Sequence, residues 1–156
     1  METVTTTQLE AAFIDAIREI VPRYEPLRDV ARWAYTERVG RQRGQANLGG
    51  HTTRSYTLIF ARANATHIWK GGLGTAYAFR LAVATAYTGV DPVQLQHMLT
   101  EDGVDLMDAL SRLRDPTVPG LCDIVEVGLQ NEDADDLGNI YVEHVFTIHY
   151  HQATDF

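Results

Sequence analysis

The sequence contains a single cysteine and a single lysine, and each scarcity limits what the chain can be. Cys122 has no partner for an intrachain disulfide, which is consistent with assembly in a reducing cytoplasm. Lys70 is the only lysine, so nearly all the positive charge is arginine, which favours planar, bidentate contacts at interfaces. No apolar run approaches the roughly 18 residues of a membrane-spanning helix. The segment 1–7 lacks the basic and apolar regions of a signal peptide, so we expect no secretory signal.

Catalytic motifs are also lacking. The glycines of 71–74 are not followed by Lys-Ser/Thr and lead into a strand pattern, which favours a turn over a phosphate-binding loop. Gly-x-Ser-x-Gly does not occur, and Cys122 has no adjacent histidine to activate it. The stretch that begins at Asp133 has Leu137 at the fifth position and His144 at the twelfth position of a calcium loop, so we reject calcium binding. We therefore expect a structural protein and not an enzyme.

The length of the chain suits a single domain, and its charge is unevenly distributed between the two halves. The 156 residues suit one domain spanning 1–156, and the 45% hydrophobic content suits a globular core. Residues 1–75 carry ten Lys/Arg and seven Asp/Glu, whereas residues 76–156 carry three and fourteen. The balances of +3 and −11 sum to the net charge of −8, which argues against a dedicated DNA binder. A basic half and an acidic half could instead bring identical copies together head to tail.

Residues 76–88 alternate strictly between a bulky face and a small, alanine-rich face, which predicts a long β-strand. Asp91-Pro92 then opens a helical run over 92–113, which Gly103 could divide into two segments with Thr100 as a new N-cap. We expect this helix to lie on the flat alanine face. Its apolar stripe consists of Leu95, Leu99, Leu106, Leu110 and Leu113.

The remaining patterns complete an α+β fold. A helix is expected over 8–21, with Thr7 as N-cap and Glu10 in a capping box. Residues 24–39 fit a short helix or an irregular segment. Strands are expected over 55–61, 121–130 and 140–151, the last two joined by an acidic turn. Two antiparallel pairs would form a four-stranded antiparallel sheet with helices packed on one face, plus a long Gly/Arg-rich loop over 40–54.

That loop carries the candidate interaction residues. It is polar and lacks any periodicity that could bury it, so we expect a flexible arm that contacts a partner. The arginines that flank or lie in it could contact phosphate, or acidic surfaces such as the turn over 132–136 of a neighbouring copy, and we prefer contact with a protein partner. The basic candidates are Arg38, Arg41, Arg43 and Arg54, and the acidic candidates are Asp133, Asp135 and Asp136.

A weak metal-site candidate lies in the last strand. His149 and His151 are two residues apart and therefore share a face, and Glu143 could supply a third ligand. Histidines in a terminal strand are more often ordinary surface residues. The preferred interpretation is no metal and no cofactor.

The order of these elements resembles the tail terminator, or tail completion, proteins and related neck proteins of long-tailed bacteriophages. The resemblance rests on an amphipathic helix, a Tyr/Phe strand (Tyr56, Phe60), and Trp-x-Gly-Gly (Trp69–Gly72) before a long alternating strand. It continues with the helix that contains Glu101-Asp102-x-x-Asp105, and with Pro-Gly-Leu (Pro119–Leu121) before a final hairpin. It covers roughly residues 8–151, except that 23–50 has no counterpart.

The resemblance implies a structural virion protein that is assembled in the host cytoplasm. Such proteins form a hexameric ring at the head-proximal end of the tail, end tail-tube polymerisation and join the tail to the head-side connector. Genomic DNA passes through the lumen without specific binding. The alternatives are a head-closure or other neck or tube subunit, and a small metal-dependent enzyme that uses His149 and His151.

Overall fold

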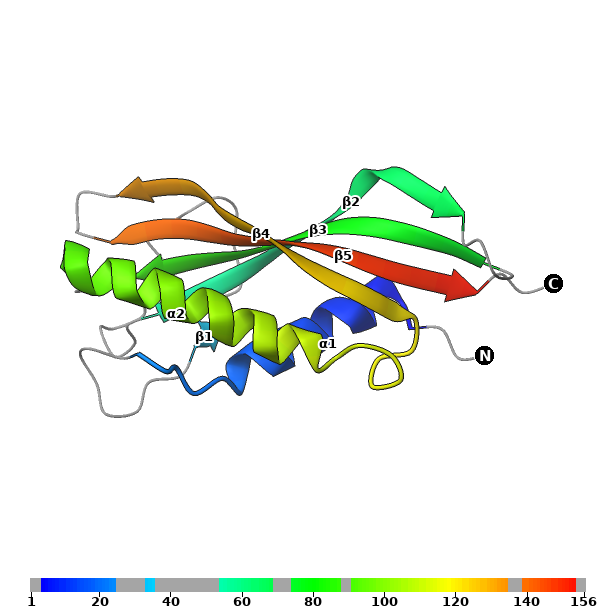
Figure 1. Ribbon diagram of the computed structural model, residues 1–156, viewed down its shortest axis with the longest axis horizontal. Helices are drawn as coiled ribbons and strands as arrows, with labels where there is room; N and C mark the ends of the chain where they lie inside the picture. Colours follow the sequence, from blue (N-terminus) through cyan, green and yellow to red (C-terminus); the bar gives the residue numbers. More distant parts are fainter. Residues whose placement is uncertain are drawn as a thin grey trace.

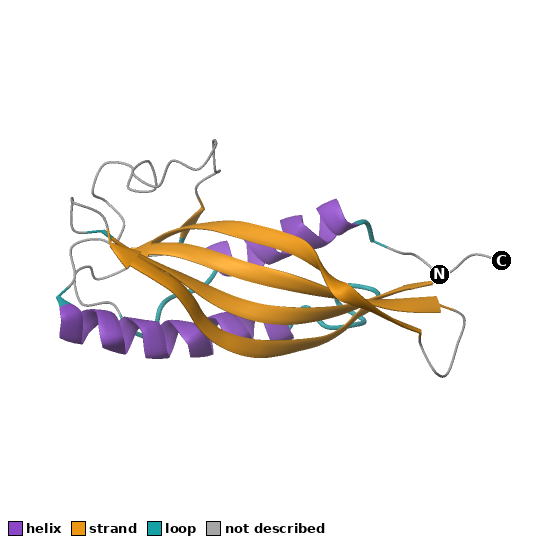
Figure 2. Ribbon diagram, turned by 90° about the horizontal axis from the view of Figure 1, so that it is seen from above, coloured by secondary structure: helices purple, strands orange, loops and turns teal. Residues whose placement is uncertain are grey.

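The computed structural model describes residues 4–24, 33–35, 54–68, 74–87, 91–134 and 139–153. These residues form two helices and five strands in the order α1, β1, β2, β3, α2, β4, β5. The strands form one long, twisted sheet, and both helices lie on the same side of it (Figures 1 and 2). The fold is therefore α+β, with an antiparallel four-stranded sheet and helices on one face, as the sequence predicts.

The four long strands are β2 (Arg54–Ile68), β3 (Gly74–Tyr87), β4 (Leu121–Ala134) and β5 (Ile140–Ala153). Their order across the sheet is β2-β3-β5-β4, and every neighbouring pair is antiparallel. The pairing within β2–β3 and within β4–β5 confirms the two predicted pairs. The chain inserts β5 between β3 and β4, which leaves β4 at one edge of the sheet.

The short strand β1 (Ala34–Tyr35) was not foreseen. It pairs in parallel with the start of β2, at Ser55 and Tyr56, and adds a fifth strand to the sheet. The preceding residue, Trp33, is buried in the core. The rest of the segment 24–39 lies largely outside the described residues, as does the Gly/Arg-rich stretch that precedes Arg54.

Helix α1 (Thr6–Arg18) begins earlier than predicted because the capping box uses different residues. The hydroxyl of Thr5 accepts from the backbone N–H of Gln8, and the Gln8 side chain accepts from the backbone N–H of Thr5. The predicted capping box of Thr7 and Glu10 is wrong. Thr5, two residues earlier, already has a glutamine three residues after it, and this pair forms the box instead.

Helix α2 (Pro92–Ser111) begins as predicted, with Asp91 as N-cap and proline in the first turn. It runs through Gly103 without a break. Gly103 lies under β4, where an added Cβ would come 3.3 Å from Oε1 of Glu126. The glycine therefore leaves room for the Glu126 carboxylate beside the helix and does not end the helix. Neither described helix combines the length and apolar composition needed to span a bilayer.

The core lies between the helices and the bulky face of the sheet, not the alanine face. Phe79, Leu81 and Val83 of β3 belong to one buried cluster with residues of both helices, including Phe13 and Leu110. The expectation that α2 lies on the alanines is therefore wrong, because large side chains remove more apolar area from water when the helices cover them. On the opposite face the alanines are shielded by taller cross-strand neighbours. Ala82, for example, lies between Ile59 and Val145.

Two glycines of β4 and its preceding turn offer a matched test of this packing. Gly120 and Gly128 both have positive φ, but only at Gly120 would a Cβ clash, 2.4 Å from the backbone oxygen of His151. We expect Gly128→Ala to lower the free energy of unfolding by about 1–3 kcal/mol through backbone strain alone. Gly120→Ala should lower it by about 1–3 kcal/mol more through overpacking. Equilibrium urea denaturation measures both, and equal losses would contradict the assigned contact.

Candidate functional site

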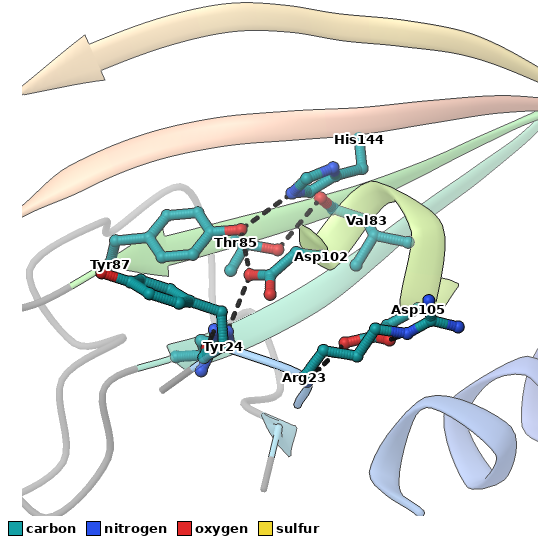
Figure 3. Close-up of polar contacts among 9 residues, drawn as sticks. Arg23, Tyr24, Val83, Thr85, Tyr87, Asp102, Asp105 and His144 are labelled. Atoms are coloured by element: carbon teal, nitrogen blue, oxygen red, sulfur yellow. Dashed lines mark hydrogen bonds and ion pairs between the residues drawn. The ribbon is translucent and has the colours of Figure 1, made fainter. Parts of the chain in front are cut away.

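A network of buried polar side chains lies where α2 crosses the sheet (Figure 3). Its centre is Oδ2 of Asp102, which accepts from Nε of Arg54 at 2.7 Å and from the hydroxyl of Tyr87 at 2.7 Å. The same hydroxyl lies 2.8 Å from Nε2 of His144. Because a phenol has one proton and Tyr87 donates it to the carboxylate, His144 must carry its proton on Nε2 and donate to Tyr87.

Each member of the network comes from a different element. Arg54 is the first residue of β2, Tyr87 ends β3, Asp102 lies in the middle of α2, and His144 lies in β5. Nη2 of Arg54 also donates to the backbone oxygen of Tyr24 at 2.5 Å, and its guanidinium stacks 5.8 Å from the centre of the Trp33 ring. The network therefore joins α2 to three strands and to the segments before and after the first gap in the described chain.

A second set of ion pairs extends the same helix face toward solvent. Arg23 binds Asp105 twice, through Nε to Oδ1 at 2.7 Å and through its backbone N–H to Oδ2 at 3.0 Å. Its guanidinium also pairs with Asp108. Asp102 and Asp105 both interrupt the apolar stripe of α2, and each faces an arginine from the first half of the chain. The opposite charges of the two halves thus meet partly within one subunit.

Burial controls the protonation of the inner network. Loss of solvation raises the pKa of Asp102 to about 6, although Arg54 and Tyr87 act in the opposite direction. Burial, followed by the charge of Arg54, lowers the pKa of His144 to about 3. Burial and the neighbouring Asp102 raise the pKa of Tyr87 well above its usual value. At neutral pH the network therefore holds one arginine, one carboxylate, one phenol and one neutral imidazole.

The network is closed to solvent. Arg54 and Asp102 are 1% and 0% exposed, and Tyr87 and His144 are 0% and 2% exposed. No substrate could reach these groups without opening the core. Their hydrogen bonds and ion pair therefore serve to hold α2 against the strands. Within the described part of the chain, Oδ1 of Asp102 accepts no hydrogen bond, which makes the buried pair costly to form and still more costly to break.

Arg54 is the only predicted basic interaction residue that the structure describes. The prediction that Arg54 lies in an exposed arm is wrong. Arg54 begins β2, and Asp102 neutralises its charge inside the core. Arg38, Arg41 and Arg43 lie outside the described residues. Among the acidic candidates, Asp133 is exposed near the end of β4, while Asp135 and Asp136 also fall outside the described ranges.

The predicted metal ligands lie on the sheet face that faces away from the helices. His149 and His151 share that face in β5, but Glu143 is six residues from His149 along the strand, about 20 Å at 3.4 Å per residue. Glu143 instead accepts from Arg80 and from Asn131, each at 3.0 Å. The strand therefore does not bring Glu143 to the two histidines. Within the described part of the chain, no three His, Cys, Asp or Glu residues gather as metal ligands would.

The edge strand β4 carries an exposed apolar surface that the sequence analysis missed. Val125, Val127 and Leu129 are 46%, 52% and 49% exposed. Simple alternation would place all three on one face of the strand, but the register shifts between Glu126 and Gly128. Val125 therefore pairs with Thr147 on the face away from the helices, Leu129 pairs with His144 on the helix face, and Val127 has no partner residue in β5. The positive φ of Gly128 marks this bulge. We call these three residues the β4 apolar row.

The buried ion pair predicts a large difference between two arginine substitutions. Arg54→Met leaves Asp102 buried without its cation, so we expect it to lower the free energy of unfolding by about 3–5 kcal/mol. Arg114 pairs with Asp123 at the surface, where both side chains are about half exposed, so Arg114→Met should cost at most about 1 kcal/mol. Urea denaturation of the two variants gives the comparison, and similar losses would contradict the structural role of the network.

The opposed pKa shifts predict opposite pH profiles for two other variants. The raised pKa of Asp102 contributes stability that is complete below its unfolded pKa of 3.8 and is lost as pH rises through about 6. The lowered pKa of His144 contributes stability that is complete above 6.5 and is lost as pH falls toward about 3. From pH 7 to pH 4 the two contributions oppose each other in the native protein.

Relative to the native protein, Asp102→Asn should therefore lose stability over this range on acidification, because only the His144 contribution remains. His144→Gln should gain stability relative to the native protein, because only the Asp102 contribution remains. The slopes approach about 1.4 kcal/mol per pH unit at most. Unfolding free energies at four pH values test this, and parallel profiles for the three proteins would contradict it.

Comparison with protein-family models matches no family, and comparison with curated proteins finds no similar sequence.

Proposed function

We propose that this protein is a structural virion protein of a tailed bacteriophage, in the role of a tail terminator. Copies form a hexameric ring at the head-proximal end of the tail, end tail-tube polymerisation and join the tail to the head-side connector. The observation that carries the proposal is the long sheet with an exposed apolar edge, in an α+β subunit whose element order resembles that family.

The β4 apolar row supports assembly of several copies. An edge strand with exposed apolar side chains is a liability in a protein that stays monomeric, since it can pair with other strands. The charge distribution supports contacts between unlike surfaces of identical copies, because residues 1–75 carry a balance of +3 and residues 76–156 one of −11. Contacts between unlike surfaces produce rings when the rotation closes.

The net charge of −8 supports a passive relation to the genome. An acidic lumen repels the phosphate backbone, so DNA can pass through the ring without binding to it. The proposed location is the neck of the virion, after assembly in the host cytoplasm. A head-closure protein or another neck or tube subunit would also assemble as a ring, but at a different position in the particle.

A small metal-dependent enzyme is the competing function. It would use His149 and His151 on the open face of the sheet, but it would need a third ligand other than Glu143, which lies about 20 Å along the strand from His149. The most strongly perturbed titratable groups, Asp102 and His144, are enclosed in the core and face no cavity open to a substrate. These positions favour the structural role.

The terminator role predicts a specific effect on tube growth. Purified tail-tube subunits are allowed to polymerise with and without this protein, and tube lengths are measured in negative-stain images. We expect tubes to stop lengthening and to carry a closed hexameric ring at one end, and light scattering should detect the ring in solution or after mixing with tubes. An unrelated acidic protein of similar size serves as the control. Tubes that lengthen unchanged and carry no ring would overturn the proposal.

A further inference from the structure

The outer edge of β4 has backbone groups and apolar side chains with which another strand could pair. The strand runs from Leu121 to Ala134, and among the strands that the structure describes it pairs with β5 alone, on one side. In an antiparallel ladder, alternate residues direct their backbone N–H and C=O groups away from the neighbouring strand, so β4 presents a row of such groups at its outer edge. The β4 apolar row lies along the same stretch and is half exposed.

The opposite edge of the sheet belongs mainly to β2. Of the strands that the structure describes, only the two-residue β1 pairs with the outer side of β2, and it reaches only Ser55 and Tyr56. The outer side of β2 over residues 57–68 has no partner among the described strands. The sheet therefore ends at two long edges, one formed by β4 and the other by this part of β2.

The directions of these two edges allow the sheet to continue from one copy to the next. Three antiparallel steps separate β2 from β4, so the two strands run in opposite directions. When a second copy is placed beside the first by rotation about a ring axis, its β2 meets β4 as an antiparallel neighbour. The helices of both copies then stay on the same side of the continued sheet, as both do within one copy (Figure 2).

The charges of the two edge strands are complementary. The sequence of β4 contains four acidic residues and no Lys or Arg, whereas residues 57–68 of β2 contain one arginine, Arg62, and no acidic residue. The other arginine of β2, Arg54, is buried against Asp102 and takes no part in this edge. The exposed acidic residues of β4 include Glu126, Glu132 and Asp133. Pairing β4 with another β4 would bring its acidic residues together, whereas pairing β4 with residues 57–68 of β2 avoids that repulsion and brings one arginine to the acidic strand.

We propose that copies of this chain associate by antiparallel pairing of the β4 edge of one copy with residues 57–68 of β2 in the next copy. The β4 apolar row is buried at this junction. This inference rests on the proposed function and names the contact that closes its ring. Each copy uses both of its edges, so a closed ring leaves no free edge along the sheet.

The test uses the full-length protein under ring-forming conditions, with tail tubes present if the ring requires them. Hydrogen exchange is compared between assembled and dilute protein. We expect the backbone amides of 121–134 and of 57–68 to become protected on assembly. The variant Val127→Lys/Leu129→Lys should raise the concentration at which half of the rings dissociate by about tenfold or more. The matched control, Val93→Lys/Val104→Lys, places two lysines on exposed positions of α2 and should change it less than about twofold.

The outcomes separate this inference from the proposed function. A ring that forms without new protection of either edge, and equally well in both variants, overturns the edge contact and leaves the terminator role standing. Open filaments with both edges protected support the contact and overturn the terminator role. A chain that stays monomeric even with tail tubes overturns both. Because hydrogen exchange is measured on the native sequence, its result holds even if the β4 variant fails to fold.

Discussion

The ion pair between Arg54 and Asp102 is the constraint on which the arrangement of the other elements depends. Two unlike charges are almost fully enclosed, so neither can lose its partner without leaving a buried charge unpaired. The pair fixes the start of β2 against the middle of α2, and Tyr87 and His144 extend the tie to the two central strands. The helices are thereby held on one face of the sheet, and they leave the edge strands β2 and β4 uncovered along their outer sides.

Among the described residues, the distribution of polar and apolar groups supports the structural role that we propose. Asp102, Tyr87 and His144, whose pKa values are strongly shifted, are enclosed in the core and join its elements, and half-exposed apolar side chains lie along the edge strand β4. Reactive chemistry requires accessible polar groups, whereas assembly requires accessible apolar and backbone groups. The accessible groups at the sheet edge are those that the proposed association of copies would use.

Much of the fold could be predicted from the sequence, because strict alternation and the Asp91-Pro92 helix start are local signals. The helix-bearing face was mispredicted because alternation shows that two faces differ, but not which one the helices cover. The role of Arg54 was missed because its partner is 48 residues away in the sequence. The exposure of Val127 was missed because it depends on a bulge beside Gly128. The position of that bulge is set by pairing with β5, which the local sequence does not show.

Our central proposal is that the two open edges of this sheet are contact surfaces between copies. The most direct measurement is a cryo-electron microscopy reconstruction of the protein on the end of a tail tube, at a resolution that separates strands. We expect a closed ring in which β4 of each subunit lies beside β2 of the next subunit, with the helices of all subunits on the same side of the sheet. Subunits that contact each other through α1 and α2, with β4 facing solvent, would contradict it.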